Sequence, residues 1–210
     1  GVFKELNVEL PAITIAVITM SDFVKAYWFI HIPVIIAIIL AIKAYAKTYG
    51  GKHLFGRLQL KIPAVRNLIV KNASAMMART LSTLLTAGVP LNEAVGIVAN
   101  TMTNIWFKEA LQEAMEQIMI GVPLSQPLQS CGLFPPMVYY MVRIGEEAGS
   151  TEEMLNRLAD YYEEEVELAV QSLMAVLEPM MIIVLAVIVG GLIAAVMAPM
   201  MKMYEALDRL

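Results

Sequence analysis

The sequence predicts an all-α membrane protein, in which two transmembrane helices flank a cytosolic antiparallel helical bundle. Of its 210 residues, 59% are apolar and 16% are charged. This is too apolar for an ordinary soluble domain and too charged for a bundle of membrane spans alone. Two long uncharged stretches lie near the two ends of the chain. Between them the apolar residues recur at helical spacing, and no strand-like alternation persists.

The last third of the chain, residues 145–201, predicts one long helix. Ser150 to Glu153 has the pattern of a capping box, in which the serine caps the helix and the glutamate reaches back to it. Residues 179–201 carry no charge, and as a helix they reach roughly 34 Å, enough to cross a bilayer core of about 30 Å. We therefore expect a soluble start, a lipid-embedded end and a bend at Pro179, where a helical hydrogen bond is lost.

An earlier uncharged run, residues 26–42, predicts another span near the lower length limit for a transmembrane helix. Aromatic side chains mark its two ends, as in the aromatic belts of membrane proteins: Tyr27, Trp28, Tyr45 and Tyr49. The helical pattern starts at Pro11, and Pro33 is expected to kink it. His31 is expected to be packed or hydrogen-bonded, with a proton carrier as the alternative.

The distribution of charge predicts the orientation of the chain. Eight bases and no acid lie in residues 43–79, whereas ten acids and one base lie in residues 144–178. Loops rich in lysine and arginine stay in the cytoplasm, and acids contribute little to this rule. We therefore predict an extracytoplasmic amphipathic segment (1–25), a transmembrane helix (26–46), a cytosolic helical-bundle domain (47–168), a transmembrane helix (169–201, membrane core about 179–201) and an extracytoplasmic tail (202–210).

The cytosolic domain is predicted to consist of short helices joined by short loops. Three glycines are expected to break the chain before the first of these helices: Gly50, Gly51 and Gly56. Gly88 suits a left-handed helix end, and Pro90 follows it. Asn104 is expected to cap a later helix, which Gly121 ends. The predicted helices run over 63–87, 91–100, from Asn104 to Gly121, 123–131 and 135–148.

The chain carries no residue pattern of a common enzyme, so we predict no catalytic activity, no cofactor and no metal site. Gly50-Gly51-Lys52 lacks the spacing of a phosphate-binding loop, and the two histidines lie too far apart for a zinc protease. No Gly-x-Ser-x-Gly elbow occurs, and neither predicted span contains an aspartate for an intramembrane protease. The basic run is expected to meet anionic lipid and not nucleic acid. Four glutamates are interpreted as a solvated face, with a divalent cation as the alternative: Glu163, Glu164, Glu165 and Glu167.

Residues 145–149, Gly-Glu-Glu-Ala-Gly, are interpreted as a helix–turn–helix connection. Gly149 is expected to end one helix before Ser150 starts the next, and Glu146 to add a buried hydrogen bond that fixes the turn. Glu178 lies at the mouth of the last span, where we expect it among lipid headgroups or, alternatively, paired with a base. Small residues repeat every four positions in this span and predict close helix packing in lipid: Ala186, Gly190, Ala194 and Ala198.

Five short motifs follow one another between residues 78 and 179. They are Ala78 to Leu91 (ARTLSTLLTAGVPL), Gly121-x-Pro123-Leu124-Ser125, Phe134-Pro135, Gly145-Glu146-x-x-Gly149 and Leu177-Glu178-Pro179. Together they resemble the inner-membrane platform proteins of type IV pilus assembly and type II secretion. Members of this family typically hold two related helical domains and three spans. The resemblance implies that this chain holds the second span, second domain and third span, with an upstream part before Gly1. The motif positions are Gly88, Pro90, Gly121, Pro135, Gly145, Glu146, Gly149, Glu178 and Pro179.

The resemblance implies a non-enzymatic platform in the bacterial inner (cytoplasmic) membrane. Such a platform couples a hexameric cytosolic ATPase to the insertion or extraction of pilin subunits. The implied partners are this ATPase, pilin, membrane lipids and further copies of the chain. Residues 134–149 and 161–163 favour the pilus branch. A type II secretion platform is one alternative, and a transporter subunit with Glu178 and His31 on an ion path is another.

Bases of the cytosolic domain are candidate docking positions for the ATPase. The same bases are alternatively intramolecular partners of the acids in residues 152–167. The candidates are Arg57, Lys61, Arg66, Lys71 and Arg79.

Overall fold

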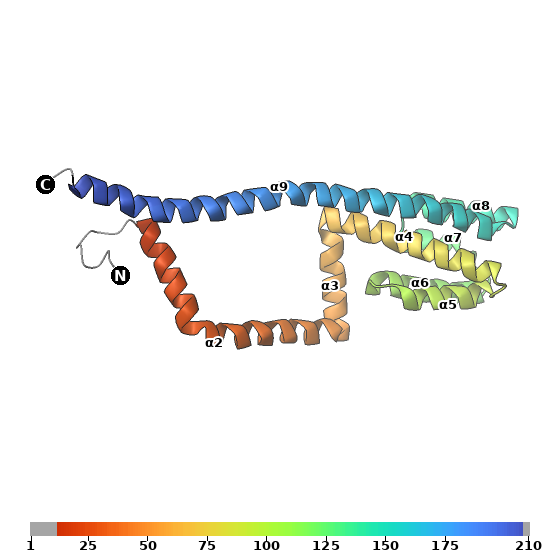
Figure 1. Cartoon of the computed structure of the whole chain (residues 1–210). Helices are drawn as coiled ribbons and strands as arrows, with labels where there is room; N and C mark the ends of the chain where they lie inside the picture. Colours follow the sequence, from red (N-terminus) through yellow and green to blue (C-terminus); the bar gives the residue numbers. More distant parts are fainter. Residues whose placement is uncertain (1–11, 208–210) are drawn as a thin grey trace. The chain divides into compact units, whose positions relative to one another are not determined.

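The structure of the protein, a computed structural model, describes residues 12–207 and contains only helices there. In chain order these helices are α2 (Ala12–Lys47), α3 (Tyr49–Lys61), α4 (Pro63–Thr86), α5 (Leu91–Thr101), α6 (Ile105–Met119), α7 (Ser125–Ser130), α8 (Pro136–Ala148) and α9 (Thr151–Leu207) (Figure 1). The all-α fold class is therefore confirmed. Residues 1–11 and 208–210, which belong to the predicted extracytoplasmic segments, lie outside the described residues, as do the side chains of Trp28 and His31.

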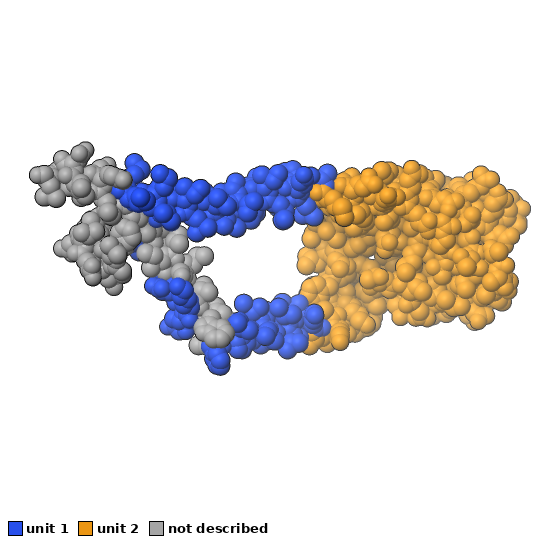
Figure 2. All heavy atoms as spheres, viewed as in Figure 1, with its two compact units in different colours: residues 1–43, 175–210 blue, residues 44–174 orange. Residues whose placement is uncertain are grey.

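The chain divides into two compact units (Figure 2). The terminal unit combines Gly1–Lys43 with Ala175–Leu210, and the central unit is Ala44–Met174. The terminal unit thus holds most of α2 and the second half of α9. The central unit holds α3 to α8 and the first part of α9.

The terminal unit exposes large apolar side chains along α9. Ile183, Leu185 and Val187, for example, are 62 to 69% exposed. Within residues 12–207, α9 is long and apolar enough to cross a membrane, and a second span is counted only if the bent pair Ile32–Lys47 and Tyr49–Lys61 forms one. The arrangement of two spans around the central unit therefore stays a prediction.

Both long helices contain a proline and continue past it. α2 holds Pro33 in its interior and is visibly bent (Figure 1), in agreement with the kink expected where a residue has no N–H to donate. α9 is helical throughout, including at Pro179. The bend at Pro179 stays a prediction.

One half of the capping box predicted at residues 150–153 is wrong: the Glu153 side chain does not reach back to the Ser150 N–H, because both groups have other partners. The Ser150 N–H donates to the Gly145 carbonyl oxygen at 2.9 Å. The Glu153 carboxylate accepts from the Arg157 guanidinium at 2.8 Å. α9 nevertheless begins at Thr151, so the turn that ends α8 sets its start.

The central unit is built around a single core, to which α4 to α9 each contribute fully buried side chains. The largest are Met77, Leu81, Val95, Val98, Phe107, Leu111, Leu124, Leu128, Val138, Val142, Leu155 and Leu158. Burying one such side chain contributes about 1.5–3 kcal/mol. The core therefore holds the short helices, which would be marginal alone, in fixed positions.

Most helix boundaries of the central unit lie close to the predicted ones. α4 starts at Pro63 and α5 at Leu91. The Asn104 Oδ1 accepts from the N–H two residues later at 3.0 Å and caps α6. Gly88 and Gly121 have φ values of +81° and +88°, the left-handed conformation expected at these helix ends. α7 is shorter than predicted, since it covers only Ser125–Ser130.

The prediction that glycines break the chain near residues 50–56 is wrong, because all three lie inside α3. A Cβ atom at Gly51 would lie 1.9 Å from the Tyr45 carbonyl oxygen, and one at Gly56 would lie 3.1 Å from the Trp106 ring. These two glycines therefore allow close approaches between segments. The break between α2 and α3 falls at Thr48, whose Oγ1 accepts from the Gly51 N–H at 3.2 Å.

Candidate functional site

The Glu146 carboxylate connects α8 to the start of α7. Its Oε1 accepts from the Leu124 N–H at 2.5 Å, and its Oε2 accepts from the Ser125 Oγ and N–H at 2.6 and 3.3 Å. Leu124 and Ser125 are buried, so these groups depend on the carboxylate for a partner, as at a helix N-terminus. The hydrogen bond predicted for Glu146 is present, but it fixes the start of α7 and not the α8–α9 turn.

Two glycines shape the turn between α8 and α9. Gly149 has φ +66° and ends α8, as predicted. Gly145 is buried, and a Cβ atom added there would lie 2.8 Å from the Thr151 Cα and 3.2 Å from the Met154 Cβ. The first turn of α9 therefore packs directly against the backbone of α8.

A groove of about 580 Å³ lies beside the Phe134-Pro135 motif. α4 contributes Arg66 to its lining, and Tyr139 of α8 contributes an aromatic ring. Phe134 is buried and packs edge-on against Phe107, with the ring centroids 5.1 Å apart. The groove thus combines a base with apolar and aromatic walls that belong to the core.

Arg79 of α4 binds three side chains of α9. Its Nε and Nη2 donate to the two Glu163 oxygens at 2.8 and 2.7 Å, while Asp160 and Asn156 each accept at 2.5 Å. The hydrogen bonds from Arg79, followed by its positive charge, lower the pKa of Glu163 from its ordinary 4.5. Glu163 and Asp160 in turn raise the pKa of Arg79. Arg79 is therefore an intramolecular partner and not a free docking base.

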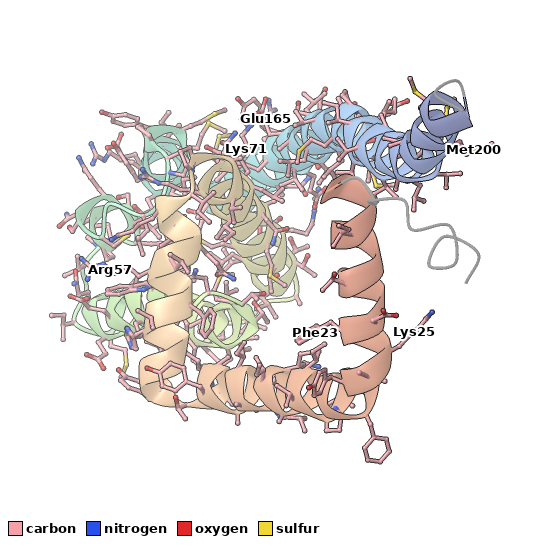
Figure 3. All side chains as sticks on the ribbon, turned by 90° about the vertical axis from the view of Figure 1, so that its left-hand side faces the viewer. Phe23, Lys25, Arg57, Lys71, Glu165 and Met200 are labelled. Atoms are coloured by element: carbon pink, nitrogen blue, oxygen red, sulfur yellow. The ribbon has the colours of Figure 1, made fainter. Side chains whose placement is uncertain are left out.

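Lys71 is also paired within the chain. Its Nζ lies 2.5 Å from the Glu165 Oε2, and both side chains are more than two-thirds buried (Figure 3). The pairs of Lys71 and Arg79 both join α4 to the first part of α9. For Lys71 and Arg79, the structure therefore favours pairing within the chain over docking to the ATPase.

The other three predicted docking bases are exposed: Arg57, Lys61 and Arg66. In the part of the chain that the structure describes, none of them forms an ion pair. Figure 3 shows Arg57 projecting from α3. These three bases are available to a partner.

A network that the sequence did not indicate ties α3 to α6. The His53 Nε2 lies 2.9 Å from the Glu109 Oε1, which also accepts from the Tyr49 hydroxyl at 3.0 Å. The Trp106 Nε1 donates to the His53 carbonyl oxygen at 3.3 Å. These partners lie 53 to 60 residues apart in the chain, so no spacing rule links them. Their polar and aromatic character was the only signal in the sequence.

The remaining predicted site residues lie on α9. Ala186, Gly190 and Ala194 are exposed and Ala198 is half-buried. A Cβ atom added at Gly190 would meet no described atom within 4 Å, so this position is open to contact with another helix. Glu178 and Pro179 are exposed, and Glu178 forms no ion pair within residues 12–207.

The four glutamates considered as a metal site differ in their surroundings, because two of them are paired with bases and two are exposed. Glu163 is bound to Arg79 and Glu165 to Lys71, whereas Glu164 and Glu167 are exposed. Across residues 12–207, no group of three metal-ligating side chains converges.

Residues 77–199 match the family model described as type II secretion system (T2SS), protein F. The chain belongs to this family. The matched range contains all nine motif residues, from Gly88 to Pro179. The resemblance to the platform proteins is thereby confirmed.

Relatives within the family carry names from both branches. The type IV pilus assembly protein PilC of Thermus thermophilus is 40% identical over 99% of this chain and 51% of its own length. PilC of Pseudomonas aeruginosa is 38% identical over 97% of this chain and 54% of its own length. The type II secretion system protein F of the same organism is 27% identical, over 97% of this chain and 50% of its own. The chain thus spans about half the length of the curated relatives it matches.

Proposed function

We propose that this chain is part of a non-enzymatic platform of a type IV pilus assembly machine in the bacterial inner membrane. The platform couples a hexameric cytosolic ATPase to the insertion or extraction of pilin subunits. The apolar parts of α2 and α9 cross the membrane, and the central unit lies in the cytoplasm. Pilin, lipids and further copies of the chain contact the membrane helices.

The contrast between the two compact units carries this proposal. Exposed apolar surface costs about 25 cal/mol per Å² in water, and a continuous apolar helix surface such as that of α9 is typical of a membrane-embedded segment. The central unit instead buries its apolar residues in one core and joins α4 to α9 by ion pairs. A rigid helical unit anchored in lipid is suited to relay force between an ATPase and membrane-embedded subunits.

The pilus branch is favoured over the secretion branch by the relatives. Two proteins named for type IV pilus assembly are 38 and 40% identical to this chain, against 27% for the type II secretion protein of Pseudomonas aeruginosa. A deletion strain separates the two branches, because loss of twitching supports the pilus role and loss of exoprotein secretion supports the other.

We further propose that the ATPase contacts the groove beside Phe134-Pro135. Arg66 is an exposed base without an ion pair among the described residues, and it lines this groove together with the Phe134-Pro135 motif. Such a base can pair with an acidic group of the partner and so fix the docking position.

The experiment compares two charge reversals in the full-length protein. Arg66→Glu should reduce co-purification of the ATPase at least about 30-fold, since removing one partner of a buried interfacial charge pair costs about 2–5 kcal/mol and each 1.4 kcal/mol is about tenfold in affinity. Arg157→Glu is the matched control, because Arg157 is exposed and pairs only with Glu153 on its own helix. Unchanged ATPase binding by folded Arg66→Glu protein would count against this groove.

No described residue supports the alternative that the chain is a transporter subunit. Glu178 is exposed on α9, and no described side chain is ion-paired with it to form an ion path.

A further inference from the structure

The outer face of α3 combines apolar and basic side chains. Leu54 and Leu58 are 57 and 52% exposed, and they lie one helical turn apart on the same face. Arg57 and Lys61 are exposed beside them, three residues after each leucine and therefore on the same side of the helix. Exposed leucines next to bases are typical of helices that lie in a membrane interface.

The opposite face of α3 is held against α6, so the outer face cannot turn inward. His53 is bound to Glu109, and the Gly56 carbonyl oxygen accepts from the Asn104 Nδ2 at 3.3 Å. Gly56 is buried where it approaches Trp106. The core of the central unit thus presents the two leucines and the two bases outward.

α3 begins at the end of the apolar helix α2. The Thr48 N–H donates to the Tyr45 carbonyl oxygen at 3.0 Å, and the Thr48 side chain caps α3. Tyr45 and Tyr49 are exposed on either side of this break, as aromatic residues are at the level of lipid headgroups. In the proposed function, on which this placement rests, α2 crosses the bilayer. Because α3 follows directly after α2, it then lies at the level of the cytoplasmic headgroups.

We propose that α3 is an interfacial helix whose outer face binds anionic phospholipid headgroups. Leu54 and Leu58 lie against the upper acyl chains, while Arg57 and Lys61 pair with phosphate groups. Charge complementarity supports this occupant, because α3 carries three bases and no acid, and none of these bases forms an ion pair among the described residues. Each base near an anionic leaflet strengthens attachment about fivefold. Arg66, on α4, is not part of this lipid-binding face and belongs to the proposed ATPase groove.

A fluorescent probe at position 58 tests the proposal in the full-length protein. The probe is attached through Leu58→Cys in a Cys131→Ser background, and the protein is reconstituted in vesicles of phosphatidylcholine and phosphatidylglycerol that contain nitroxide-labelled lipid. We expect strong quenching at position 58. Ile120→Cys is the negative control, because Ile120 is 80% exposed in the connection after α6. Val187→Cys, on the apolar part of α9, is the positive control.

Lipid charge is tested with a pair of double variants. Arg57→Gln with Lys61→Gln should lower the preference of the position-58 probe for labelled phosphatidylglycerol over labelled phosphatidylcholine, by up to about fivefold for each base. Arg143→Gln with Arg157→Gln removes the same charge from outside α3 and should leave this preference unchanged. Equal quenching by both labelled lipids in the probe-labelled protein that retains Arg57 and Lys61 would overturn the assignment to anionic headgroups.

The remaining outcomes separate this proposal from the proposed function. Quenching at position 187 but not at position 58 overturns the interfacial role of α3 and leaves the membrane platform intact. No quenching at either position overturns the membrane placement as well. Cross-linking of position 58 to the ATPase in cells, without lipid quenching, would assign the face to a protein partner and overturn the proposal.

Discussion

The Glu146 Oε1 on α8 accepts a hydrogen bond from the Leu124 N–H at the start of α7, at a distance of 2.5 Å. The two residues belong to two different family motifs and lie 22 positions apart in the chain. Their contact shows that the two motifs build one junction between helices. The two residues therefore serve a structural role in this chain, which is to hold the start of α7 against α8.

Removing this carboxylate should destabilise the central unit. Glu146→Ala leaves the buried N–H groups of Leu124 and Ser125 without an acceptor, which costs about 1–3 kcal/mol in the free energy of unfolding. Chemical unfolding of the full chain in detergent measures the change. Glu147→Ala, at the exposed neighbouring position, should stay within about 0.5 kcal/mol. Equal effects of the two substitutions would show that the contact contributes nothing specific.

A side chain at position 145 should open the α8–α9 turn. In Gly145→Ala the added Cβ lies 2.8 Å from the Thr151 Cα, which forces a backbone shift that costs about 1–3 kcal/mol. Gly50→Ala is the control, because a Cβ there meets nothing within 4 Å and alanine suits a helix better than glycine. Thermal unfolding should give a lower Tm for the first variant and an unchanged or higher Tm for the second. The reverse order would contradict the close approach.

The Arg79–Glu163 pair should make stability depend on pH below about 4.5. The pKa of Glu163 is lower in the folded protein than its ordinary 4.5, so its contribution is complete above that pH and is lost as the pH falls through the folded pKa. Arg79→Gln should lose no more than about 1 kcal/mol at pH 7, since both side chains are substantially exposed to solvent. Its unfolding should also change less between pH 4.5 and pH 3 than that of the unsubstituted protein.

Urea unfolding at several pH values measures this difference. Arg157→Gln is the control, because Arg157 pairs with Glu153 on an exposed helix face and contributes at most about 0.5 kcal/mol. A pH profile of Arg79→Gln parallel to that of the unsubstituted protein would show that Glu163 gains nothing from Arg79.

A larger side chain in the small-residue stripe of α9 should weaken the assembly of the protein, since we expect this stripe to pack against another helix. Gly190→Leu fills a position where a Cβ now meets no described atom, and in an oligomer it would separate two helix backbones. Light scattering in detergent should then show a smaller assembly. Ile188→Leu, on the opposite side of α9, should leave the assembly unchanged. An unaltered assembly in both variants would exclude the stripe as an interface.

Local chemistry in the sequence was sufficient for several of the helix ends. Pro63 starts α4, Gly88 adopts a left-handed φ after it, and Asn104 caps α6. Each of these effects acts within a few residues, so the sequence alone contains the cause. The length and apolar character of α9 likewise follow from composition.

Contacts between distant segments could not be predicted in the same way. Glycine often breaks a helix, but Gly56 lies inside α3. Its lack of a side chain leaves room for the Trp106 ring, which approaches it closely. Glu146 was expected to act on its own turn, yet its partner is Leu124. Arg79 was predicted to dock a partner or, alternatively, to pair within the chain, and α9 supplies its three partners. In each case the deciding neighbour lies far away in the chain.

Thiol labelling tests most directly whether the central unit is a cytoplasmic body held by the membrane. Asn72→Cys and Glu164→Cys introduce exposed thiols on α4 and α9 in the full-length protein with Cys131→Ser. A membrane-impermeant maleimide should label neither position in intact spheroplasts and both after the inner membrane is opened. Labelling of one position before opening, and of the other only afterwards, would place them on opposite sides of the membrane and contradict the proposed platform.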